Sequence, residues 1–143
     1  MTSYIAPYIL ESEYMCGCGE CGGLPPAFRD DQLPTIYTEF FDDFSVIRNV
    51  WGKPINISSG YRCPKYNASI GGSLLSAHCF GIALDCDVEP SEVDDLDAII
   101  EDIASHLRRG KYTGTKSFIH LDVAYEIYPR ARLSWTQGYR WTG

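Results

Sequence analysis

The apolar residues between Thr35 and Trp51 recur at intervals of three and four positions. Acidic residues and Arg48 occupy the positions between them, so one face is apolar and the other is charged. The apolar face consists of Ile36, Phe40, Phe41, Phe44, Ile47 and Trp51. This period predicts a helix that ends before Gly52 and Pro54 and buries one face in a core.

A second amphipathic segment follows Pro90 and Ser91. Its apolar stripe consists of Leu96, Ile99, Ile100, Ile103 and Leu107. Acidic Asp94 falls in the expected first turn, and Arg108-Arg109-Gly110 would end the helix. His106 lies near the expected C-terminus, where the helix dipole favours a histidine, and no catalytic role is assigned to it.

Several short segments alternate between apolar and polar residues, which is typical of half-buried strands. The main ones are residues 55–59, 81–88 and 118–123, with shorter aromatic-rich segments at 132–135 and 139–141. Pro64 is expected to open a short helical turn through Asn67. Together the patterns predict the α+β class, with a small, mainly antiparallel sheet packed with two main helices.

The length of 143 residues suits one domain, which we expect to span residues 1–143. Residues 1–34 are predicted to be an extended, turn-rich lead-in, and residues 35–143 the catalytic core. Apolar residues make up 45% of the chain, which excludes a disordered protein. The net charge of −7 and the lack of dense basic clusters argue against nucleic-acid binding, and Arg108-Arg109-Lys111 is interpreted as a solvated face.

The sequence contains no apolar run long enough to span a membrane, so membrane insertion is not expected. Its first residues lack the basic and apolar regions of a secretory signal. A substrate outside the cytoplasm would then be reached by lysis or on a particle. The expected location is the host cytoplasm before lysis, or a phage virion.

Three of the six cysteines, Cys16, Cys18 and Cys21, lie within the glycine-rich run CGCGECGG. They could bind part of a structural zinc ion, form disulfides, or remain free thiols. In the zinc interpretation the fourth ligand would be Cys63, Cys79 or Cys86. The second C-x-x-C pair that would favour zinc is absent, so the three alternatives stay open.

Two of the three histidines lie in segments suited to building a site. His78 precedes a predicted turn at Gly81, and Asp85 lies on the strand that follows. Ala83 shares a strand face with Asp85 and leaves space between ligands. With His120 from a later strand, the set is His2Asp, which leaves a fourth zinc position for water. Hydrogen-bonding or capping functions for these residues are the alternative.

The segment from Ser59 to Val88 resembles the signature of the M15 family of zinc peptidases, in its branch of small peptidoglycan hydrolases. That branch carries S-x-H-x-x-G-x-A-x-D followed by H-x-D, and each fixed position is present. These positions are Ser76, His78, Gly81, Ala83, Asp85, His120 and Asp122. The resemblance covers roughly residues 35–125 and implies a fold like that of hedgehog proteins and D-Ala-D-Ala carboxypeptidases.

The resemblance implies one catalytic zinc ion and hydrolysis of peptide bonds in peptidoglycan stem peptides or cross-links. Arg62 is placed where relatives hold a substrate carboxylate or carbonyl oxygen, although a structural ion pair is the alternative. Ser76 is expected to form structural or substrate hydrogen bonds. Four aromatic residues could line the substrate groove, although aromatic residues at such spacing also pack in cores: Tyr61, Trp135, Tyr139 and Trp141.

The sequence departs from the family pattern at the position of the general base. Several family members have an acidic residue three positions before the second histidine, and here that residue is Ser117. Asp122 is predicted either to transfer the proton or to orient a histidine ligand. Asp87 is a third acidic candidate.

Two functions therefore compete at the level of the sequence. The first is a phage cell-wall-degrading enzyme, whose partner is peptidoglycan. The second is a non-catalytic module of a phage tail or baseplate that docks on the wall or on neighbouring tail proteins. A third possibility is an interaction protein built on zinc-bound cysteines.

Overall fold

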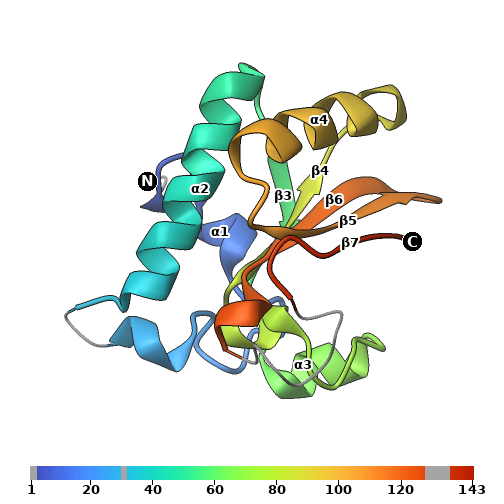
Figure 1. Ribbon diagram of the computed structural model, residues 1–143. Helices are drawn as coiled ribbons and strands as arrows, with labels where there is room; N and C mark the ends of the chain where they lie inside the picture. The colour runs from blue at the N-terminus through green and yellow to red at the C-terminus, as the bar shows by residue number, and fades with distance from the viewer. Residues whose placement is uncertain (1–2, 30–31, 128–135) are drawn as a thin grey trace.

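The computed structural model describes residues 3–29, 32–127 and 136–143 (Figure 1). Its longer helices are α2 (Thr35–Trp51) and α4 (Val93–Ile103), and the shorter ones are α1 (Glu11–Tyr14) and α3 (Pro64–Ser69). Turns of 3-10 helix are η1 (Pro26–Arg29), η2 (Ala77–Phe80), η3 (Pro90–Glu92) and η4 (Ala124–Glu126). The strands are β1 (Tyr4–Ala6), β2 (Ile9–Leu10), β3 (Asn56–Ser59), β4 (Ala83–Asp87), β5 (Arg108–Thr113), β6 (Ser117–Asp122) and β7 (Arg140–Thr142).

The main sheet has five strands in the order β3-β4-β6-β5-β7. Strand β4 pairs antiparallel with both β3 and β6, and β5 pairs antiparallel with β6. Only the β5–β7 pairing within this sheet is parallel. The predicted α+β class with a mainly antiparallel sheet is therefore confirmed.

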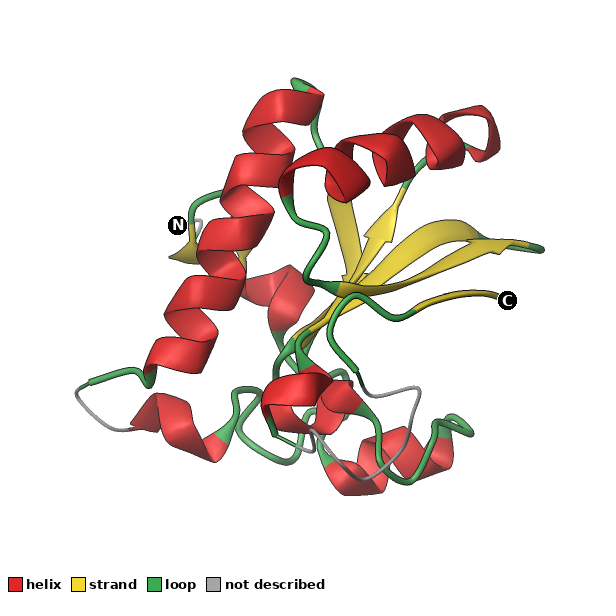
Figure 2. Cartoon of the chain, in the orientation of Figure 1, coloured by secondary structure: helices red, strands yellow, loops and turns green. Residues whose placement is uncertain are grey.

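Helices α2 and α4 pack against each other and lie on the same side of the main sheet (Figure 2). The strand residues that alternate toward them are almost completely buried: Leu84, Cys86, Ile119 and Leu121. The alternate positions of β4 and β6, which carry Asp85 and His120, lie on the opposite face of the sheet. The hydrophobic core thus fixes which side chains build the site.

The prediction that the second helix continues to Leu107 is wrong. Helix α4 ends at Ile103, and Arg108 begins strand β5. Leu107 is fully buried in the turn between them, so it keeps the spacing of the helical stripe without being helical. His106 lies in the same turn, where its Nε2 pairs with Asp43 Oδ2 at 2.7 Å.

The predicted solvated face at Arg108 and Arg109 is also wrong, because both side chains are buried. Arg109 donates from Nε to Asp97 Oδ1 at 2.6 Å and from Nη2 to Glu101 Oε2 at 2.5 Å. These ion pairs join β5 to α4.

The lead-in is more ordered than the extended segment predicted for residues 1–34. It contains the β1–β2 pair and helix α1, and it contributes fully buried Ile9 and Tyr14 to the core. Tyr14 Oη donates to the Gly81 carbonyl at 2.6 Å, which ties the lead-in to the loop that carries His78.

In the part of the chain that the structure describes, no helix is long and apolar enough to cross a membrane. The strand predicted at residues 132–135 lies outside the described residues.

Candidate metal centre

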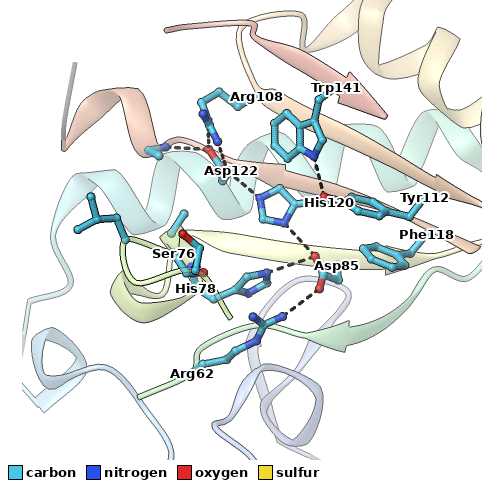
Figure 3. Close-up of a pocket in the computed structure, with 14 residues that line it drawn as sticks. Arg62, Ser76, His78, Asp85, Arg108, Tyr112, Phe118, His120, Asp122 and Trp141 are labelled. Carbon is cyan, nitrogen blue, oxygen red and sulfur yellow. Dashed lines mark hydrogen bonds and ion pairs between the residues drawn. The ribbon is translucent and has the colours of Figure 1, made fainter. Parts of the chain in front are cut away.

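His78, Asp85 and His120 converge on the sheet face opposite α2 and α4 (Figure 3). Asp85 and His120 are direct register partners on β4 and β6, and His78 comes from η2. Asp85 Oδ1 lies 3.2 Å from His78 Nε2 and 2.9 Å from His120 Nδ1. One donor atom from each residue lies within 4.8 Å of the other two.

The orientation of His78 is set by its backbone surroundings. Ser76 caps η2, and its Oγ accepts a hydrogen bond from the His78 backbone N–H at 3.2 Å. Gly81 ends the turn with a φ of 76°, a conformation that favours glycine, as the sequence predicted. His78 Nδ1 donates to the Gly60 carbonyl at 2.6 Å, which leaves Nε2 directed at Asp85. Burial lowers the pKa of His78, so its imidazole is neutral and can offer a lone pair.

His120 lies between two carboxylates. Its Nδ1 faces Asp85, and its Nε2 lies 2.7 Å from Asp122 Oδ2. Burial alone would lower the pKa of His120, but its bonds to Asp122 and Asp85 outweigh burial and raise the pKa to about 9. At neutral pH this raised pKa favours an imidazolium that donates to both carboxylates.

Asp122 is almost completely buried, and both of its oxygens are engaged. Arg108 donates to Oδ1 from Nε at 2.8 Å and to Oδ2 from Nη2 at 3.3 Å. The Ala124 backbone N–H also donates to Oδ1 at 2.9 Å. Burial would raise the pKa of Asp122, but His120 and Arg108 overcome that effect and lower it. This carboxylate is fixed in place and remains charged.

Arg62 lies at the edge of the same cluster, with its guanidinium held by three groups. Nε donates to Ser59 Oγ at 2.9 Å, Nη1 to Asn67 Oδ1 at 3.2 Å and Nη2 to Asp85 Oδ2 at 3.3 Å. About 17% of its side chain is exposed. A fixed cation beside Asp85 is suited to an anionic or carbonyl oxygen in the pocket.

These groups line a cavity of about 280 Å³, whose other wall is aromatic. Tyr112 and Phe118 stack with ring centroids 4.5 Å apart, and Trp141 Nε1 donates to Tyr112 Oη at 2.7 Å. A Cβ at Gly110 would meet the Trp141 ring at 2.3 Å, so glycine is required there for the indole to cross β5. The Trp141 ring centroid thereby lies 5.4 Å from that of His120.

The arrangement fits a zinc ion. His2Asp is a typical donor set, the donors share one face, and His120 has the outer carboxylate that commonly orients a metal-binding histidine. The open side faces the cavity, where a fourth ligand or substrate could enter.

A family model described as Peptidase M15 matches residues 15–122. The chain belongs to the Peptidase M15 family. A search of curated proteins found no match. The resemblance seen in the sequence motifs is thus confirmed, and M15 membership implies a peptidase of the metal-dependent kind. The match includes the cysteine-rich part of the lead-in as well as the site.

The structure of this M15 peptidase brings most of the predicted site residues together. Arg62 and Ser76 line the cavity with the three candidate ligands. Tyr61 is buried and is not among the described residues that line the cavity. Burial and nearby cysteines raise the pKa of the Tyr61 phenol to about 12. Trp141 lines the cavity and Tyr139 does not, while Trp135 lies outside the described residues. Asp87 also lies outside that lining, and its Oδ2 accepts from Asn56.

Sequence reasoning missed several residues that line the cavity, and Arg108, Tyr112 and Phe118 are the charged and aromatic ones among them. Arg108 was assigned to a helix end, although Arg108 and Tyr112 alternate with Arg109 and Lys111 as in a strand. That alternation was the available signal. The register of β5 against β6 then sets Arg108 opposite Asp122 and Tyr112 opposite Phe118.

Proposed function

We propose that this M15 peptidase uses one zinc ion at His78, Asp85 and His120 to hydrolyse peptide bonds in peptidoglycan stem peptides or cross-links. The observation that carries the proposal is the convergence of these three donors on one open side of a polar cavity. A structural zinc site would normally be closed by a fourth protein ligand.

When bound, zinc would supply a Lewis acid and lower the pKa of a water molecule. The protein's own contribution is to fix the donors. The Gly60 carbonyl holds His78 with Nε2 free, and the sheet register keeps Asp85 opposite His120. Asp122 holds His120 from behind, so the donor positions exist before metal arrives.

Arg62 is proposed to bind the substrate. Its guanidinium is already anchored by Ser59 and Asn67, so little side-chain entropy is lost on binding a carboxylate or carbonyl oxygen. The D-amino acid end of a stem peptide carries such a carboxylate. Ser76 lines the cavity with its hydroxyl, although that oxygen also caps η2.

The aromatic wall formed by Tyr112, Phe118 and Trp141 offers apolar contact for the rest of a short peptide. The net charge of −7 gives no long-range attraction to an anionic wall, so recognition would be local to this cavity. We propose that this activity serves phage-mediated wall degradation, either by a free endolysin or by a virion-borne enzyme.

The position of Asp122 favours an orienting function over proton transfer. Its oxygens accept from His120, Arg108 and Ala124, which leaves little capacity to take a proton from the reacting water. Among the described residues that line the cavity, the other carboxylate is the candidate ligand Asp85.

This lack of a free acid in the described lining supports a second candidate function. The same cavity could bind a wall peptide without cutting it, as part of a phage tail or baseplate that docks on peptidoglycan. Binding without hydrolysis would use Arg62 and the aromatic wall and would not require a base.

Digestion of purified peptidoglycan distinguishes the two functions. The zinc-loaded protein is expected to release new amines, and mass spectrometry of the products identifies the bond. His120→Ala should abolish release, while His106→Ala, which removes a histidine outside the cavity, should leave it unchanged. Zinc binding without release from walls of several chemotypes would refute the enzyme and favour docking.

A further inference from the structure

A second group of metal-ligating side chains lies outside the cavity. Cys16, Cys18 and Cys21 come from the lead-in, and Cys63 precedes helix α3. The four Sγ atoms all lie within 4.8 Å of one another. Two of the thiols are buried, and the other two are only partly exposed.

The spacing of the sulfur atoms suits a tetrahedral ion. The Sγ atoms of Cys18 and Cys63 are 3.8 Å apart. Four sulfurs placed at the usual Zn–S distance of about 2.3 Å would be separated by about 3.8 Å along each tetrahedral edge. A disulfide would require about 2.05 Å instead, and it would join the thiols only in pairs. All six cysteines are described, and none of them forms a disulfide.

The backbone around the cluster donates hydrogen bonds to sulfur. The Cys63 N–H donates to Cys16 Sγ at 3.3 Å, and the Glu20 N–H donates to Cys18 Sγ at 3.3 Å. The Tyr66 N–H donates to Cys63 Sγ at 3.4 Å, which caps helix α3. Such donors stabilise thiolates, the form in which cysteine binds metal.

We propose that Cys16, Cys18, Cys21 and Cys63 bind a second, structural zinc ion. Four thiolates complete a tetrahedral shell and leave no position for water, so this site is closed and takes no part in hydrolysis. The sequence allowed three candidates for the fourth ligand, and the structure favours Cys63. Cys79 and Cys86 lie outside the group.

The position of this site indicates what the ion would do. Cys63 follows Arg62 directly in the chain, and α3 carries Asn67, which accepts from the Arg62 guanidinium. An ion shared by Cys63 and the lead-in would fix the loop that presents Arg62 to the cavity. The second zinc would therefore position a substrate-binding residue without touching substrate.

Zinc content and X-ray absorption test the proposal on the intact chain. Wild-type protein should hold about two zinc ions, and His120→Ala about one, because that variant keeps all four thiols. The absorption fine structure of His120→Ala zinc should show four sulfur ligands at about 2.3 Å. This measurement requires no catalysis, so it is independent of the proposed peptidase activity.

Cysteine variants provide the matched comparison. Cys18→Ser should lose one zinc ion, whereas Cys79→Ser, which removes a thiol outside the cluster, should keep both. If Cys18→Ser fails to fold, the His120→Ala absorption measurement still decides. Nitrogen or oxygen ligands in that spectrum, absence of zinc, or mass-spectrometric detection of disulfides among these four residues in freshly purified protein would overturn the proposal.

Discussion

The two candidate metal centres differ in how the fold builds them. Asp85 and His120 lie on paired strands whose register holds them together, and His78 is fixed by a backbone carbonyl. The cysteine cluster brings three residues from one loop to Cys63 elsewhere in the chain. The first centre is held by strand pairing and the Gly60 carbonyl, whereas the second lies between two segments that share the hydrogen bond from the Cys63 N–H to Cys16 Sγ.

The donors differ in number and chemistry as well. Three donors beside a cavity leave a coordination position for reaction, and charged groups around them tune their protonation. Four thiolates would fill all four coordination positions of a zinc ion, which is typical of a structural site. Within one small chain, an open site and a closed site would thus divide catalysis from stabilisation.

Removal of the charge behind His120 gives the largest expected effect on this contrast. Asp122→Asn removes the buried charge that pairs with Arg108 and His120, and breaking a buried ion pair costs about 3–5 kcal/mol in free energy of unfolding. Zinc affinity at the open site should fall about 10–100-fold, because outer carboxylates tune histidine ligands. Denaturant unfolding and zinc titration measure the two changes.

Asp87→Asn is the matched control, because Asp87 lies outside the described lining of the cavity. It should leave zinc affinity at the open site unchanged. Unaltered zinc affinity in Asp122→Asn, combined with complete loss of hydrolysis, would instead assign proton transfer to Asp122.

Acidification should weaken the open site through proton competition. The pKa of His120 is raised to about 9, so below that pH zinc must displace one proton, while neutral His78 and ionised Asp85 release none. Affinity should fall about tenfold for each pH unit below 9. Calorimetry in buffers of different ionisation enthalpy, with the cysteine site already filled, counts the released protons. Affinity independent of pH between 6 and 8 would contradict this account.

A conservative change at Arg62 separates substrate binding from metal binding. Arg62→Lys keeps the positive charge, so zinc content should not change. It loses the planar guanidinium that donates to Ser59 and Asn67. Loss of a charged hydrogen bond worth roughly 1.5–3 kcal/mol should lower kcat/KM by roughly 10–100-fold. Steady-state kinetics on a stem peptide measures this. Equal activity would restrict Arg62 to a structural ion pair with Asp85.

The smallest effect is expected at the aromatic wall. Tyr112→Phe removes the acceptor of the Trp141 indole N–H and should lower the free energy of unfolding by about 1 kcal/mol. Both zinc sites should remain filled. Thermal unfolding monitored by tryptophan fluorescence measures the change, and a loss of activity greater than tenfold would mean that the hydroxyl contacts substrate.

The sequence predicted the parts of the fold that local periodicity controls. Helix α2 has the predicted bounds, and the strands containing Asp85 and His120 were expected from alternation. Arg108 could not be placed in this way, because charged residues after an apolar stripe also suit a helix end. Its burial depends on pairing with Asp122, a contact between strands that no local period encodes.

The metal donors likewise divide into those that local sequence patterns predicted and those that depend on tertiary contacts. The motif spacing and the family resemblance brought out His78, Asp85 and His120. The sequence left two functions open for Asp122, because its contacts with His120 and Arg108 are tertiary. The cysteine spacing alone left three possible fourth ligands. The position of Cys63 beside the lead-in is a tertiary contact, and it selects among them.

Stepwise zinc removal tests the division between an open catalytic site and a closed structural site most directly. A chelator is added gradually while zinc content, circular dichroism and amine release from peptidoglycan are followed in the same samples. Hydrolysis should disappear when about one sulfur-bound zinc ion remains, with the fold intact, and should return on addition of zinc. Hydrolysis that persists in protein holding only the sulfur-bound ion would contradict the account.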